Sequence, residues 1–253
     1  MKIEVLSAWY NEEFLAPLFL RHYAWADQTT ILLEPTTNDG TRDEIARFTN
    51  VRIVDAPMPD GKLDDYMKME QINAAFAWSD ADWLVVVDAD EFVFPIDLNT
   101  KALKEPRWCI EEANRTGCNV IMCRMWQVYR CVTDVDVDRT QPPALQRRHG
   151  DPDLGHSRGL YQKPSVVKKG DITSMGIGIH GVGGTTKPIV YGPEWRGAHW
   201  LYADPAYVYK RRLADRFRRL SKRNISFQGD SDWFEDQHLK MELDRGWNFA
   251  QLF

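Results

Sequence analysis

The sequence predicts one α/β domain, residues 1–253, with a doubly wound, mixed but mostly parallel sheet and helices on both faces. Three observations favour this class. The length of 253 residues suits one large α/β domain. The first half alternates strand-like and helix-like segments, which is the pattern of a nucleotide-binding half. Residues 83–87, Trp-Leu-Val-Val-Val, are continuously apolar, as is typical of a parallel strand buried on both faces.

The segments of the first half can be assigned in order. Strands are predicted at residues 2–8, 29–33, 51–54 and 83–87, and helices at 11–23, 41–48 and 64–78. Asn11 is placed to cap the first helix, although Pro17 must delay its start or kink it. Residues 38–40, Asn-Asp-Gly, form a turn. The third helix is expected to bury Met69, Ile72, Ala75 and Phe76 on one side.

The second half is less regular. A helix is predicted at 107–114, strands at 119–129, 160–167 and 189–191, a glycine-rich stretch at 175–184, and a last helix at 232–245. Residues 133–158 are polar without an apolar period and are expected to form a loop that closes over an acceptor. Asp204 and Pro205 are placed to start a helix. We expect three parts within the domain: residues 1–100, 101–225 and a helical extension at 226–253.

Composition limits the classes of function. The net charge of −5 disfavours general nucleic-acid binding, yet residues 204–224 carry a local charge of +6. That segment is a candidate for contact with anionic lipid headgroups or for neutralising a diphosphate, with Arg211 or Arg212 nearest the site. No CxxC pair occurs, so four free thiols are expected. No signal peptide or membrane-spanning run is evident, and we expect a cytoplasmic protein, with a peripheral position at the inner face of the membrane as the alternative.

The most informative residues follow the apolar run directly. Asp88, Ala89, Asp90 and Glu91 come at the carboxyl end of a strand that reads as buried, where open α/β sheets bind ligands. Two carboxylates at positions i and i+2 can turn toward one hard cation. Mg²⁺ or Mn²⁺ bound this way keeps positions open for phosphate oxygens. The sequence therefore predicts a divalent-cation site here.

These residues carry a resemblance. Residues 83–92 resemble the metal-binding segment of glycosyltransferases with the GT-A fold, and are most similar to the family-2-like group with an Asp-Ala-Asp-Glu-Phe motif. Residues 7–13 resemble that group's first strand and Asn-Glu helix start, and residues 34–41 resemble the acidic turn after its second strand. The order and spacing of these segments agree with that group over residues 3–95. After residue 100 the resemblance is limited to scattered features. The resemblance implies a nucleotide-sugar-binding half at 1–100 and an acceptor-binding, metal-completing half at 101–225.

The resemblance also implies roles for single residues. Donor-binding residues would be Tyr10, Asn11, Glu34, Asp39, Lys68, Asp88 and Ala89. Glu34 would accept a hydrogen bond from the nucleobase, where the group usually has Asp. Asp39 also fits a turn and cap residue, and Lys68 and Asn73 fit an exposed lysine and a cap-like amide. Asp90 would bind the metal, Asp88 the ribose or the metal, and Glu91 would orient its neighbours.

A histidine from the second half often completes the metal site of such enzymes, and His199 and His180 are the two candidates. His199 follows Gly197-Ala198, and it also fits a core histidine between Trp195 and Trp200. The catalytic base is left open among Asp151, Asp153, Asp171, His180 and Glu194. The acids Glu235 and Asp236 come too late in the chain for that role.

The implied activity is transfer of a hexosyl or pentosyl group from a nucleotide-diphosphate sugar to a hydroxyl acceptor, with Mn²⁺ or Mg²⁺ and with inversion. The acceptor would be a glycan or a lipid-linked glycan, in surface glycan or polysaccharide synthesis. Two alternatives remain. One is a nucleotidyltransferase acting on sugar phosphates, although residues 7–13 lack the glycine and basic residues of its loop. The other is a non-catalytic carbohydrate-binding protein, which the ten tryptophans would fit.

Overall fold

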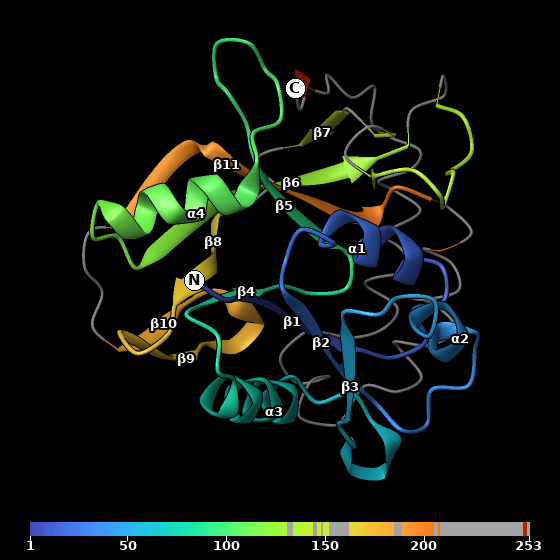
Figure 1. The fold of residues 1–253 in the computed structure, drawn as a ribbon. Coiled ribbons are helices and arrows are strands. Elements are labelled where there is room, and N and C mark those ends of the chain that lie inside the picture. Colours follow the sequence, from blue (N-terminus) through green and yellow to red (C-terminus); the bar gives the residue numbers. More distant parts are fainter. Residues whose placement is uncertain are drawn as a thin grey trace.

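The structure is a computed structural model that describes residues 1–130, 134–143, 146–147, 149–151, 162–184, 189–204, 207 and 250–251. Its described part forms a large mixed sheet with helices on both faces (Figure 1). The α/β class predicted from the sequence is confirmed.

The main sheet and a small hairpin account for the strands. The strands are β1 (Ile3–Trp9), β2 (Gln28–Leu33), β3 (Val51–Asp55), β4 (Trp83–Val86), β5 (Glu91–Pro95), β6 (Val120–Tyr129), β7 (His149–Asp151), β8 (Gln162–Lys168), β9 (Ile172–Met175), β10 (Val182–Gly184), β11 (Ile189–Tyr202) and β12 (Ala250–Gln251). The helices are α1 (Ala16–His22), α2 (Thr41–Ile45), α3 (Asp65–Trp78) and α4 (Pro106–Arg115), with 3₁₀ turns η1 (Pro59–Gly61) and η3 (Ile177–Ile179). The hairpin consists of β9 and β10.

The two halves of the main sheet differ in strand direction. In the first half β3, β2, β1 and β4 are parallel, with Leu6 in register with Thr30 and Val86. Beyond β4 the order continues through β8, β6 and β11 to β5. β8 is antiparallel to β4 and β6, and β5 is antiparallel to β11, whereas β11 is parallel to β6. The edge at which β4 ends is therefore also the edge at which β5 and β8 begin.

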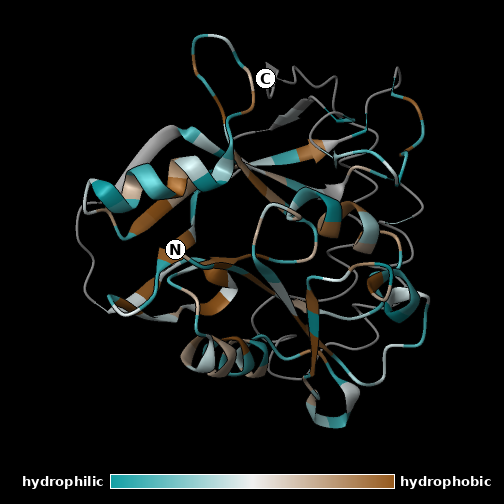
Figure 2. Cartoon of the chain, viewed as in Figure 1, coloured by the Kyte–Doolittle hydropathy of each residue, from teal (hydrophilic) through white to brown (hydrophobic). Residues whose placement is uncertain are grey.

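The parallel strands are buried because helices cover both faces. Residues of α1, α2 and α4 share one apolar cluster with Val5 and Val85. On the other face, four residues of α3 pack with Leu6 and Leu84. These four are the predicted ones: Met69, Ile72, Ala75 and Phe76. In Figure 2 the central strands carry hydrophobic segments, and much of α2 and α4 is hydrophilic.

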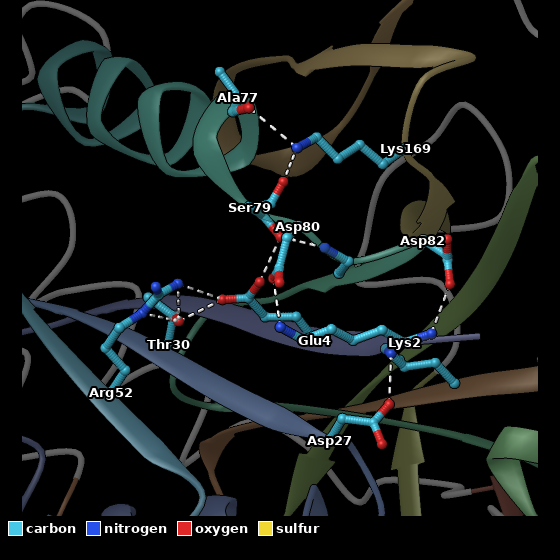
Figure 3. Close-up of polar contacts among 12 residues, drawn as sticks. Lys2, Glu4, Asp27, Thr30, Arg52, Ala77, Ser79, Asp80, Asp82 and Lys169 are labelled. Atoms are coloured by element: carbon cyan, nitrogen blue, oxygen red, sulfur yellow. Dashed lines mark hydrogen bonds and ion pairs between the residues drawn. The ribbon is translucent and has the colours of Figure 1, made fainter.

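A polar cluster lies at the opposite, amino edge of the parallel strands (Figure 3). Glu4 of β1 is buried and accepts hydrogen bonds from the hydroxyls of Thr30 and Ser79. Arg52 of β3 donates to the same carboxylate at 3.0 Å, and its guanidinium lies 4.1 Å from the ring centroid of Trp78. The cluster connects β1, β2 and β3 with the end of α3.

The sequence prediction misses some features of the first half. Helix α1 begins late, as Pro17 predicted, but Leu15 rather than Asn11 occupies the cap position. Asn11 has a positive φ of 52° and lies in the loop after β1. Strand β5 was not predicted, because the acids before it suggested a loop. Helix α2 ends at Ile45, earlier than residue 48.

The second half differs from the prediction in three places. β7 lies within the predicted loop 133–158, β11 runs to Tyr202 instead of ending at residue 191, and the glycine-rich stretch contains β10. Asp204 accepts a hydrogen bond from the Tyr207 N–H at 2.9 Å, as expected of a helix cap. The helix predicted after Asp204, the helix at 232–245 and most of the extension at 226–253 lie outside the described residues. Cys109, Cys118 and Cys123 are free thiols. No helix in the described part is long and apolar enough to cross a membrane.

Candidate active site at the carboxyl edge of the sheet

The acids after β4 form a turn into β5, which we call the carboxylate turn (residues 88–91). The Glu91 N–H donates a hydrogen bond to the Asp88 carbonyl at 3.0 Å. In the sheet order β8, β6 and β11 lie between β4 and β5, so the turn joins two strands that do not pair with each other. Side chains from distant parts of the sequence lie beside its acids.

Asp88 lies between two lysines. Lys68 of α3 pairs with one carboxylate oxygen, and Lys163 of β8 has its Nζ 3.7 Å from the other. Burial by itself raises the pKa of Asp88, but the attraction of Lys68 and then of Lys163 outweighs it, so the pKa lies well below the usual range. Asp88 is therefore ionised at neutral pH, with a cation beside each oxygen.

Glu91 holds the carboxylate turn together, as predicted for a residue that orients its neighbours. Its side chain is fully buried. Oε2 accepts a hydrogen bond from the Asp88 N–H at 3.1 Å, and Oε1 pairs with Lys163 Nζ at 2.5 Å. On the α1 side, the Tyr23 hydroxyl donates to the Glu91 carbonyl at 2.9 Å and accepts from the Val93 N–H. Both the side chain and the backbone of Glu91 are thus fixed.

Asp90 and His199 face each other across the turn. Antiparallel pairing of β5 with β11 puts His199 in register with Glu91. Asp90 Oδ2 lies 3.5 Å from His199 Nε2, and the Asp90 carbonyl accepts a hydrogen bond from the Trp200 N–H at 2.7 Å. The sequence named both residues, 109 positions apart, and the structure brings them together.

The Asp90–His199 pair has the chemistry of a divalent-cation site. Neighbouring ligands of an octahedral cation with bonds of about 2.1 Å lie about 3 Å apart, close to the observed separation. A carboxylate with an imidazole suits Mn²⁺ better than Mg²⁺. No third His, Cys, Asp or Glu joins them in a metal-ligating group within the described part of the chain. His199 Nδ1 is buried without a hydrogen-bond partner among these residues. The two side chains therefore fit the predicted cation.

The loops after β1 and β2 hold most of the predicted donor-binding residues. The Asn11 amide donates to the Asn38 side chain at 3.0 Å, and the Asn38 N–H donates back to Asn11 at 2.9 Å. This exchange joins the two loops at the carboxyl ends of adjacent strands. Tyr10 is half-buried beside Asn11, and the side chain of Ala89 packs in the main core.

Glu34 and Asp39 both organise the loop after β2. The buried Glu34 carboxylate accepts hydrogen bonds from the Thr36 N–H and hydroxyl. Asp39 accepts from the Thr41 N–H at 3.0 Å and from the Glu13 N–H at 3.2 Å. The turn and cap contacts expected of Asp39 are thus present. Both acids lie at the same edge of the sheet as the carboxylate turn.

Three candidates lie elsewhere. Asp171 follows β8, whose last residue pairs with Trp83, so it lies about five residues, roughly 16 Å of strand, from Asp88. Glu194 pairs with Lys104 and precedes His199 by five residues on β11, so a similar length of strand separates it from His199. His180 is exposed on the β9–β10 hairpin, which packs on α3. Asp171 and Glu194 are therefore poor candidates for a base beside Asp90.

Asn73 has a structural role. Its amide donates to the Met175 carbonyl at 3.1 Å and accepts from the Met175 N–H at 2.7 Å, which joins α3 to β9. The side chains of the remaining candidates lie outside the described residues: Asp151, Asp153, Arg211, Arg212, Glu235 and Asp236.

Sequence reasoning missed Lys163 and Tyr23. Lys163 lies in a strand with buried Ser165, Val166 and Val167 and is itself only 3% exposed. A lysine is seldom buried unless it is paired. A lysine within an apolar strand segment could therefore have indicated that Lys163 pairs with buried acids. Tyr23 carried no comparable signal, because its hydroxyl contacts depend on the path of β5.

Comparison with known proteins gives a likeness in fold. No protein family and no curated protein sequence matches the chain. TarS of S. aureus shares 15% identity over 66% of this chain and 28% of its own, with a TM-score of 0.42. Glucosyl-3-phosphoglycerate synthase of Mycobacterium tuberculosis, solved with Mn²⁺, uridine diphosphate and phosphoglyceric acid, shares 15% over 50% of this chain and 43% of its own, at 0.32. A 4-diphosphocytidyl-2C-methyl-D-erythritol synthase shares 11% identity over 68% of this chain and 78% of its own, with a TM-score of 0.36. At these identities and TM-scores the likeness is one of fold alone.

Proposed function

We propose that the protein is a metal-dependent glycosyltransferase that moves a sugar from a nucleoside-diphosphate sugar to a hydroxyl acceptor with inversion. The observation that carries the proposal is the approach of Asp90 to His199, at 3.5 Å, at the carboxyl edge of the sheet. A carboxylate and an imidazole at a ligand-binding edge fit a cation that also contacts a diphosphate. The neighbouring loops supply an acid and amides suited to a nucleoside.

Each residue has a defined task in this proposal. Asp90 and His199 hold Mn²⁺ or Mg²⁺, which when bound stabilises the charge that develops on the leaving diphosphate. Lys68, on the first turns of α3, lies beside Asp88 and can donate to a phosphate oxygen. Glu34 accepts a hydrogen bond from the nucleobase, and Asn11 and Tyr10 line the nucleoside side.

Among the acids that the sequence leaves open as the catalytic base, Asp151 is the one whose backbone the sheet register places near His199. Gln127 of β6 pairs with His199 of β11 on one side and with Asp151 of β7 on the other. Two strand spacings separate Asp151 from His199, which is about 10 Å between their backbones. On this backbone spacing we propose Asp151 as the base that deprotonates the acceptor hydroxyl. Asp171 and Glu194 are less suited to this task, because each lies about five residues of strand away from the site.

The test combines binding with product analysis. Nucleoside diphosphates should raise the melting temperature in the presence of Mn²⁺ and not in EDTA. With a donor sugar the released product should be a nucleoside diphosphate. Release of inorganic pyrophosphate from a nucleoside triphosphate and a sugar phosphate would instead identify a nucleotidyltransferase, and binding of sugar without any turnover would identify a carbohydrate-binding protein.

Asp90→Asn should abolish transfer and metal-dependent nucleotide binding while the protein remains folded. Asp60→Asn is the matched control, because Asp60 is exposed and Asn tolerates its positive φ of 52°. The control should keep full activity. Wild-type turnover by Asp90→Asn in metal-depleted buffer would overturn the proposal.

A further inference from the structure

Four charged side chains lie at the carboxylate turn, and the function proposed above gives no task to two of them, Lys163 and Glu91. Lys68 and Lys163 supply two positive charges, and Asp88 and Glu91 supply two negative charges. Lys163 contacts both acids, and Glu91 contacts both Lys163 and the Asp88 backbone. The four groups form one connected network directly beside Asp90.

Lys163 is an unusual residue to find at this place. It lies in β8, between β4 and β6 in the sheet, and is 3% exposed. A buried ammonium is costly unless it is paired and hydrogen-bonded. Its pairs are with Glu91, at 2.5 Å, and with Asp88, at 3.7 Å. Since replacing a buried ion pair by apolar residues is often neutral for stability, stability alone does not explain a lysine here.

We propose that Lys163 is a positioning residue for the metal site, acting through Glu91; this rests on the proposed function. Lys163 fixes one oxygen of Glu91, and the other oxygen holds the Asp88 N–H. The Glu91 N–H holds the Asp88 carbonyl, so Glu91 connects both ends of the turn. Asp90 lies within that closed turn, and its direction toward His199 follows from the turn's geometry.

The position of β8 explains why this task falls to a residue so far along the chain. The carboxylate turn lies at the sheet edge at which β8 begins, and Lys163 is the second residue of β8. A long side chain near the start of β8 can therefore reach both Asp88 and Glu91.

The test separates positioning from stability. Lys163→Met leaves Glu91 buried without its cation and risks unfolding, so the main variant is Lys163→Met with Glu91→Leu, which removes both charges. We expect this double variant to fold and to bind Mn²⁺ with a nucleoside diphosphate at least tenfold more weakly. In the free protein, amide exchange at Asp88 should accelerate at least tenfold, because its acceptor is gone.

Arg52→Met is the matched control, because it removes a cation from the buried Glu4 at the opposite edge of the sheet. It should lower the melting temperature and leave the Mn²⁺ requirement unchanged. A double variant with the wild-type Mn²⁺ requirement and wild-type Asp88 exchange would overturn the proposal. If the wild type shows no metal-dependent nucleotide binding, the proposed function fails. The exchange measurement on Lys163→Met, with Glu91→Gln as a second variant, still decides whether Lys163 fixes the turn.

Discussion

At the scale of single residues, His199 has the clearest expected effect. We expect His199→Ala to raise the Mn²⁺ concentration for half-maximal activity about tenfold or more, because Asp90 then holds the cation without the imidazole 3.5 Å away. Activity with Mn²⁺ should exceed that with Mg²⁺ in the wild type, and this preference should shrink in the variant. Metal titrations of turnover measure both.

His180→Ala, on the exposed hairpin, serves as the control histidine variant. It should leave the metal requirement unchanged. A large fall in the melting temperature of His199→Ala without metal, together with an unchanged metal requirement, would make His199 a core residue.

His22 gives the fold a pH dependence at the same scale. Burial lowers its pKa to about 4, against the opposing effect of its hydrogen bond to Val93. The unfolded chain takes up a proton near pH 6.5 and the folded protein does not until about pH 4. The free energy of unfolding should therefore fall as the pH drops from 6.5 to 4, by up to about 3 kcal/mol from this group.

Denaturant unfolding of the wild type and of His22→Gln at pH 7.5 and pH 5 checks this effect. The glutamine amide can still donate to Val93 but does not titrate, so the variant should lose less stability on acidification. Equal losses in both proteins would contradict the assignment.

At the scale of elements, the contact between α3 and the β9–β10 hairpin depends on Asn73. Its amide exchanges two hydrogen bonds with the Met175 backbone. Asn73→Ala should lower the free energy of unfolding by about 1–3 kcal/mol, because it leaves a backbone N–H and a carbonyl without partners. Amide exchange in β9 should accelerate, while metal-dependent nucleotide binding remains. Unchanged exchange in β9 would mean that the hairpin is held by its apolar contacts alone.

At the scale of the whole molecule, the two edges of the sheet have different tasks. At the amino edge, polar contacts around Glu4 connect the strands (Figure 3). The carboxyl edge carries the candidate site. Arg52→Met should therefore cost stability, about 1.5–3 kcal/mol for a hydrogen bond to a charged group, with no effect on the Mn²⁺ requirement. Denaturant unfolding and metal titration together test this division. A shift in the metal requirement would show that the two edges are coupled.

The sequence by itself determined the parallel half and the identity of the central acids. A continuous apolar run marks β4, and the spacing of Met69, Ile72, Ala75 and Phe76 marks the buried side of α3. These features are local, because strand and helix periods are set by adjacent residues. Asp88 and Asp90 could be named because they interrupt such a run.

Only the tertiary structure decided which residues meet those acids. β5 and β11 pair across a hundred residues of sequence, and that register places His199 beside Asp90 and Glu194 farther along the strand. The antiparallel direction of β8 brings Lys163 to the carboxylate turn and carries Asp171 away from it. Strand order and direction follow from the burial of whole faces, which no short segment specifies. The sequence therefore predicted the carboxylates, and the long-range pairing of strands determined which side chains contact them.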